Sequence, residues 1–228
     1  TFVHVHTAAG ELVAQLTGDT SYCTFAVTGI EQFVTAEEGR ITAGTTPAVA
    51  GDSYLEVGPI VGDLSIVIDW CFEQTTATQR ARWLAYGDQA VWNVWHPDDA
   101  QWGGRARPWT GWSIDNPSNN YYYSFLRATM LLGIAGRGEL ASADQWLDFF
   151  RNTKIAQQLV PTFERDLVGG GSREGTGYGT AMMRLWEIYD LWYGTTGEDI
   201  SSWTGHTRAS LLHFMHYTLP TLDGVSLN

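Results

Sequence analysis

The residues best suited to chemistry lie in a glycine-rich stretch, GGGSREGTGYG, at residues 169–179. It places Arg173, Glu174 and Tyr178 among glycines, which adopt backbone angles closed to other residues and let a ligand approach the chain. A tyrosine can transfer a proton, and a nearby arginine favours its ionised form. The alternative is a mobile connector, which many glycine-rich loops are. We interpret the stretch as a functional loop.

A second candidate region is a predicted loop over residues 96–118, rich in Gly, Pro and Trp. Loops of this length in a compact domain are often functional. Flat aromatic rings provide a stacking surface for sugars, and the guanidinium fork of arginine binds carboxylates in two places. The candidate ligand-binding residues are Trp102, Arg105, Arg107, Trp109 and Trp112, and His96 is a candidate catalytic histidine. The alternative is a loop whose tryptophans anchor it to its own helices.

A third group begins the helix predicted over residues 119–136. Elimination beside a carboxylate needs a group that neutralises the acid, a base, and an acid for the leaving oxygen. Asn119 or Asn120, Tyr178, and Arg173 or Arg165 could supply them. Tyr121 or Tyr122 could stack on the substrate, since consecutive helical residues point in different directions. Asp166 and Glu174 instead suit the acid and base of a glycoside hydrolase.

The charge balance narrows the class of partner. The chain has 228 residues, 13 basic and 25 acidic, for a net charge of −12. This disfavours nucleic acid and anionic membranes as partners, and no apolar run is long enough to span a membrane. Cys23 and Cys71 fit buried apolar positions, and the sequence leaves their pairing open. The chain begins without Met, as a processed or excised chain does, and we expect a secreted or periplasmic protein.

The apolar spacing predicts an all-α fold in one domain covering residues 1–228. Helices are predicted over residues 19–38, 52–72, 78–95, 119–136, 139–158, 178–193 and 200–219, with long loops at 96–118 and 159–177. Short turns alternate with long loops, which is typical of antiparallel helical hairpins. Such hairpins can form an incomplete (α/α) toroid with both long loops on one face. An irregular helical bundle is the structural alternative.

Three stretches, residues 66–80, 119–135 and 170–199, resemble in order and spacing the alginate lyase and heparinase II/III-like polysaccharide lyases. That resemblance implies an (α/α) toroid and β-elimination of uronic-acid polysaccharides. It implies that Asn119 or Asn120 neutralises the substrate carboxylate and that Tyr178 transfers the proton. The sequence departs from the family where Tyr121 stands in place of the usual His, and we expect no β-sandwich within residues 1–228.

We therefore expect a lyase that binds an acidic polysaccharide or oligosaccharide without a cofactor or metal. His213 and His216 share a helix face but have no third ligand at suitable spacing. Two further functions stay open: a glycoside hydrolase using Asp166 and Glu174, and a non-catalytic toroid that binds glycan or serves in assembly. The oligomeric state does not follow from the sequence.

Overall fold

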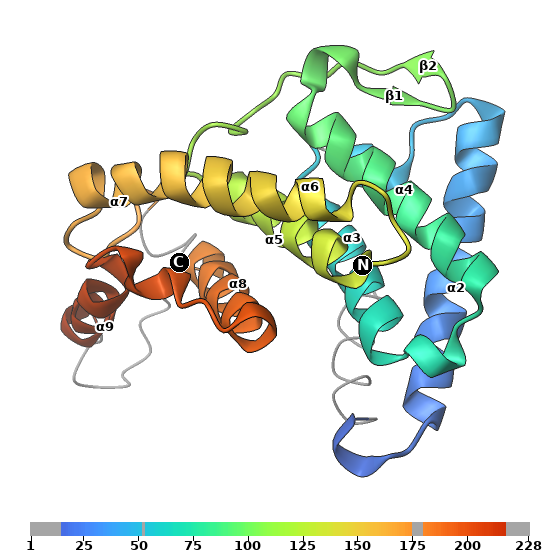
Figure 1. Ribbon diagram of the computed structural model, residues 1–228. Helices are drawn as coiled ribbons and strands as arrows, with labels where there is room; N and C mark the ends of the chain where they lie inside the picture. Colours follow the sequence, from blue (N-terminus) through green and yellow to red (C-terminus); the bar gives the residue numbers. More distant parts are fainter. Residues whose placement is uncertain (1–14, 52, 175–179, 218–228) are drawn as a thin grey trace, which may run out of the picture.

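The computed structural model describes residues 15–51, 53–174 and 180–217, and its architecture is helical (Figure 1). The helices are α2 (Ser21–Ala43), α3 (Val57–Trp70), α4 (Ala77–Trp95), α5 (Asn120–Ala135), α6 (Ala143–Asp148), α7 (Val160–Asp166), α8 (Thr180–Thr196) and α9 (His206–Tyr217). Short 3₁₀ helices occur at Ala48–Ala50, Phe72–Gln74, Pro97–Asp99 and Ile200–Trp203. The predicted all-α class is confirmed.

Two helix starts follow directly from their capping residues. Thr76 accepts a hydrogen bond from the Gln79 backbone N–H, and the Gln79 side chain accepts one from the Thr76 N–H, which together form a capping box at the start of α4. The Asn119 side chain caps α5 by accepting from the Tyr121 N–H at 3.1 Å. Both helices begin within a residue or two of the predicted positions.

Other boundaries differ from the prediction. Helix α2 continues through Gly39 and ends before Gly44, whose φ of +74° forms the left-handed cap. The helix predicted over residues 139–158 continues through a π-helix, η4 (Phe149–Leu159), into α7. Pro161 lies where the π-helix changes to α-helix, a position at which a missing backbone N–H is better tolerated. The second long loop therefore begins after Asp166 and not at residue 159.

Helix α5 lies between two groups of helices (Figure 1). Phe125, Ala128 and Leu132 pack into a core with α2, α3 and α4, whereas Leu126 and Met130 pack into a second core with η4, α7 and α8. Helix α5 thus holds both cores together. Its N-terminus, with Asn119, is reached by loops from both sides.

The contact between α3 and α5 depends on Gly58. A Cβ atom at Gly58 would lie 2.5 Å from Ser124 Oγ and 2.8 Å from Ser124 Cα. The Gly58 backbone N–H donates to Ser124 Oγ at 3.0 Å, and Ser124 Oγ donates to the Leu55 carbonyl. Glycine is therefore required here for close approach of the two backbones.

Two features of the fold did not follow from the sequence. Cys23 and Cys71 form a disulfide that joins α2 to the end of α3, so they are not separate buried thiols. The loop after α4 contains a small antiparallel hairpin, β1 (Gln101–Trp102) and β2 (Arg105–Ala106), with Gln101 paired to Ala106. Figure 1 shows this hairpin beside the end of α2, on the opposite side of the molecule from α7.

Candidate functional site

Three of the residues singled out from the sequence meet at the N-terminus of α5. The Glu174 carboxylate accepts one hydrogen bond from the Asn119 side-chain amide at 2.8 Å. Its other oxygen accepts one from the Asn120 backbone N–H at 2.7 Å. The first turn of a helix presents free N–H groups and a partial positive charge, which favour a carboxylate. This position therefore binds a carboxylate, and in this chain the carboxylate belongs to Glu174.

The carboxylate of Glu174 is half-buried. Burial raises its pKa above the usual value, and the hydrogen bond from the Asn120 backbone opposes that shift. Tyr123, one turn into α5, donates its hydroxyl to the Pro117 carbonyl at 2.7 Å. Burial first, and then the charges of Tyr189 and Glu174, raise the Tyr123 pKa. Tyr123 is therefore a neutral structural donor beside the carboxylate.

The start of the glycine-rich loop is fixed by α9. Ser210 donates its hydroxyl to the Gly170 carbonyl at 2.8 Å, and the ring nitrogen Nε2 of His206 lies 3.3 Å from the Gly171 oxygen. Gly170 has a φ of +78°, and a Cβ there would lie 2.2 Å from the Ala209 carbonyl carbon. Glycine at this position lets the loop approach α9, and the loop then reaches Glu174 at α5.

The two arginines of this region bind Asp166. Arg165 donates two hydrogen bonds to Asp166, at 3.0 and 2.8 Å, and Arg173 lies 3.3 Å from the same carboxylate. The hydrogen bond from Arg165 is the main reason that the Asp166 pKa is lowered. Arg173 thus pairs with Asp166 and not with the adjacent Glu174.

The stretch that leads into α5 is held by Lys154, the only lysine of the chain. Its ammonium donates to the Ile114 carbonyl at 2.9 Å and to Asp115 at 3.0 Å. The same nitrogen lies 4.1 Å from the centre of the Trp95 ring, a cation–π contact. Burial lowers the Lys154 pKa, and Asp115 opposes that shift. Lys154 therefore positions the segment before Asn119.

The prediction that Trp102 and Tyr122 offer their rings to a substrate is wrong, because both side chains are buried. Trp102 is 3% exposed and donates its indole N–H to the Tyr54 hydroxyl at 3.1 Å. Tyr122 is 0% exposed and donates its hydroxyl to the Lys154 carbonyl at 2.8 Å. Their polar tips satisfy internal partners and their rings fill the core.

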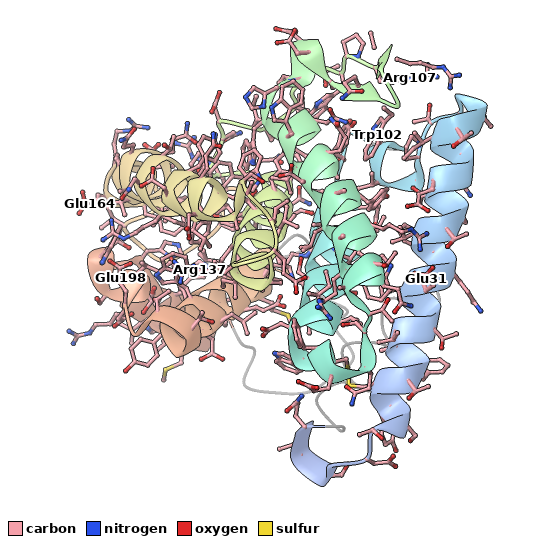
Figure 2. All side chains as sticks on the ribbon, turned by 45° about the vertical axis from the view of Figure 1, so that its right-hand side comes forward. Glu31, Trp102, Arg107, Arg137, Glu164 and Glu198 are labelled. Atoms are coloured by element: carbon pink, nitrogen blue, oxygen red, sulfur yellow. A yellow bond between two sulfur atoms is a disulfide. The ribbon has the colours of Figure 1, made fainter. Side chains whose placement is uncertain are left out.

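The two arginines of the predicted sugar-binding wall lie at the end of α2, whereas the Trp109 ring packs against Phe125 of α5 with ring centres 6.0 Å apart. Arg105 donates to the Ile41 carbonyl at 3.1 Å and Arg107 to the Gly44 carbonyl at 2.6 Å, which ties the hairpin to the end of α2. Trp109 donates to the Asn93 carbonyl at 2.9 Å. Figure 2 shows Arg107 and Trp102 at this end of the molecule and Glu198 at the opposite side. Among the described residues, Glu174 of the second loop contacts Asn119 at the end of the first.

Four further candidates from the sequence are Trp112, Tyr121, His96 and Tyr178. Trp112 is 55% exposed and Tyr121 packs at the edge of the first core. His96 stacks on Trp92 with ring centres 4.3 Å apart and makes no hydrogen bond or ring contact with Asn119, Asn120 or Glu174. Tyr178, the predicted proton-transfer residue, lies outside the described residues.

Arg184 of α8 did not stand out in the sequence. It lies near a buried cluster in which Arg127 of α5 binds Asp63 of α3 at 3.1 Å and Glu187 of α8 at 2.9 Å. Burial, and then the like charge of Arg127, lower the Arg184 pKa, and the charges of Glu56, Glu187 and Asp63 oppose that shift. No carboxylate in the described part of the chain lies within ion-pairing distance of Arg184. The half-buried guanidinium is a candidate anion ligand that only the packing of α8 on α5 reveals.

Comparisons with known proteins leave the family open. The sequence matches no family model, and searches of curated proteins and of solved structures found no match. Within residues 15–51, 53–174 and 180–217, no group of three His, Cys, Asp or Glu side chains could hold a metal ion. In the same residues, no helix has the length and apolarity needed to cross a membrane. The resemblance to polysaccharide lyases stays a prediction.

Proposed function

We propose that the chain binds an acidic glycan at the N-terminus of α5 and cleaves it by β-elimination. The observation that carries the proposal is the pair of hydrogen bonds by which the Asn119 side chain and the Asn120 backbone hold a carboxylate, at 2.8 and 2.7 Å. Neutralising a carboxylate is the first requirement of elimination beside it, because it makes the neighbouring carbon-bound proton removable.

Asn119 is oriented for this role by contacts on both sides of its amide group. Its oxygen accepts from the Tyr121 N–H, and one of its two amide hydrogens is donated to Glu174. A carboxamide has two N–H donors, and within the described residues only the one directed at Glu174 has an acceptor, so the second can bind a ligand. Glu174 thus orients the amide, and the free N–H binds the uronate carboxylate of the substrate. Tyr178, four residues after Glu174 in the sequence, is the proposed proton-transfer residue.

Two further features support the proposal. The half-buried Arg184 makes no ion pair within the described residues, so its guanidinium can bind an anionic ligand, although the more distant charges of Glu56, Glu187 and Asp63 already act on it. The Cys23–Cys71 disulfide is typical of an oxidising compartment, which supports a secreted or periplasmic location. The arrangement of the helices as an incomplete (α/α) toroid belongs to the same proposal and rests on the resemblance described above.

A glycoside hydrolase is the second candidate, and one observation favours it. The environment raises the pKa of Glu174 and lowers that of Asp166. In a hydrolase, the carboxyl group with the raised pKa acts as general acid, and the one with the lowered pKa acts as base or nucleophile. Glu174 would then be the acid and Asp166 the base or nucleophile. The strong pairing of Asp166 with two arginines explains its shift equally well as a structural ion pair.

A product assay separates these functions. Purified protein is incubated with alginate, heparan, hyaluronan and polyglucuronate while ultraviolet absorbance and reducing ends are followed together. A lyase forms a C4=C5 double bond, so absorbance rises with the reducing ends. A hydrolase produces reducing ends alone. Binding without either signal indicates a non-catalytic glycan-binding protein. If absorbance, reducing ends and binding are all absent, glycan recognition itself is overturned.

Two variants test the assigned roles. Asn119→Ser keeps a good helix cap but removes the amide, so α5 should form while turnover falls. Tyr178→Phe removes only the hydroxyl and should lower turnover about 10²-fold, the typical size of acid–base catalysis. Asn152→Ser, an asparagine of the π-helix, is the matched control and should keep parent activity. Full activity in Asn119→Ser would contradict the assignment of this residue.

A further inference from the structure

A second region able to bind a ligand lies between α8 and the segment that leads into α9. This pocket has a volume of about 400 Å³ and is lined by Trp186, Tyr189, Asp190, Tyr193, Asp199, Ser201 and Thr207. Its volume falls within the range of about 300–1,000 Å³ that is common for ligand sites. The first four of these residues follow the i, i+3, i+4, i+7 spacing of one helix face. The pocket therefore combines three aromatic rings with carboxylates and hydroxyls.

The lining contains two polar groups without hydrogen-bond partners among the described residues. One is the hydroxyl of Tyr189, a residue that is 7% exposed as a whole and lines the pocket. The other is the buried indole N–H of Trp186. Buried polar groups are normally paired, because losing water without a new hydrogen bond is costly. A ligand in this pocket would meet unused hydrogen-bonding capacity.

Asp199 and Asp190 supply the acceptors. One oxygen of Asp199 accepts from the Ser201 backbone and hydroxyl, at 3.1 and 2.6 Å, and no hydrogen bond to its other oxygen occurs in the described part of the chain. Burial, and then the charge of Asp199, raise the Tyr189 pKa, so this phenol stays protonated and donates. Asp190 is exposed on the same face of α8. The site thus offers both donors and acceptors.

These groups select among classes of ligand. Two carboxylates disfavour an anionic sugar. An organic ammonium would suit the rings and the carboxylates but has no acceptor for the tyrosine hydroxyl. A sugar hydroxyl both donates and accepts, so it can pair with Tyr189 and with an aspartate at once, while the sugar face stacks on an aromatic ring.

We propose that the pocket lined by Trp186, Tyr189, Tyr193, Asp190 and Asp199 binds an uncharged sugar unit. This site differs in charge from the carboxylate-binding position at α5 and does not depend on the proposed elimination. It would let the chain bind a glycan that contains neutral units, whether or not the chain cleaves it.

The test measures binding of neutral trisaccharides to the purified chain. Maltotriose, cellotriose and mannotriose are titrated by calorimetry, and binding is checked by saturation-transfer NMR. We expect at least one of them to bind. Tyr189→Phe and Asp190→Asn should each weaken binding about three- to tenfold, the effect of one lost hydrogen bond. Tyr22→Phe, which removes an exposed phenol of α2, is the matched control and should change nothing.

The outcomes are exclusive. Absence of binding by all three trisaccharides, or equal affinity in parent, Tyr189→Phe and Asp190→Asn, overturns the proposal. Displacement of the trisaccharide by tetramethylammonium would show a cation site instead. Trigalacturonate should not displace it, even if that acid binds elsewhere. If circular dichroism shows that Tyr189→Phe is unfolded, the exposed Asp190→Asn variant decides the question.

Discussion

At the scale of single residues, the candidate site is defined by the contacts of Glu174 with Asn119 and the Asn120 backbone. A carboxylate at a helix N-terminus is stabilised by the local N–H groups. Burial opposes ionisation, and the net effect is a raised Glu174 pKa. The side chain is therefore easier to protonate in the folded state than in the unfolded chain.

This shift predicts the pH dependence of the site. A raised folded-state pKa means that the folded protein binds the proton more tightly, so the stability from Glu174 is fully present below the unfolded pKa. It is lost as pH rises through the folded pKa. Titration of the Glu174 carboxyl by NMR should give a pKa above the ordinary glutamate value of 4.5. A pKa at or below that value would contradict the described burial.

Replacement of Asn119 separates its two structural roles. Asn119→Ala removes both the α5 cap and the contact with Glu174, and should reduce the free energy of unfolding by about 1–2 kcal/mol. Asn119→Ser keeps the cap and should lose less. Urea unfolding measures both values. Equal losses in the two variants would show that the cap contributes nothing.

At the scale of elements, the packing of α3 on α5 sets the place of Asn119. Gly58→Ala should reduce the free energy of unfolding by about 1–3 kcal/mol, because its Cβ would lie 2.8 Å from Ser124 Cα. Gly39→Ala is the matched control within α2, where nothing lies within 4 Å of the added Cβ. It should stabilise by about 0.5–1 kcal/mol through helix propensity. Unchanged stability in Gly58→Ala would contradict the close approach of α3 and α5.

The elements that the sequence predicted well are those with local signals. Thr76 and Gln79 specify the start of α4, and Asn119 caps α5, because capping depends on residues three or fewer apart. No local signal predicted the π-helix η4 or its continuation into α7, which contains Pro161. They depend on packing of η4 and α7 in the second core. The disulfide likewise joins residues 48 positions apart.

The candidate site was predicted in part. Asn119, Asn120 and Glu174 were identified from the sequence, but their direct contact appears only when the glycine-rich loop is placed against α5. Trp102 and Tyr122 were mistaken for ligand-binding residues, because a buried and an exposed aromatic residue look alike in a sequence. Arg184 was missed, since its burial beside Arg127 is a tertiary effect.

At the scale of the whole molecule, the disulfide joins the first described helix to the core that contains α3. Cys23 and Cys71 are 48 positions apart, and the chain-entropy relation gives about 4 kcal/mol for a loop of this length. The double variant Cys23→Ser with Cys71→Ser should lose about that much in urea unfolding under oxidising conditions. Reduction of the parent should give a similar loss. An unchanged midpoint in both would show that the bond does not form.

The most direct test of the central claim follows the amides of the carboxylate-binding position during ligand binding. A uronate tetrasaccharide is titrated into ¹⁵N-labelled protein, and the Asn119 side-chain and Asn120 backbone signals are recorded. The proposed function predicts that the Asn119 side-chain signals move with the binding curve, because the substrate carboxylate accepts a hydrogen bond from the second amide N–H. The Asn120 signal should follow the same curve, because its N–H is donated to Glu174, which orients that amide. Binding that leaves both signals unchanged, or no binding of any uronate tetrasaccharide, would contradict it.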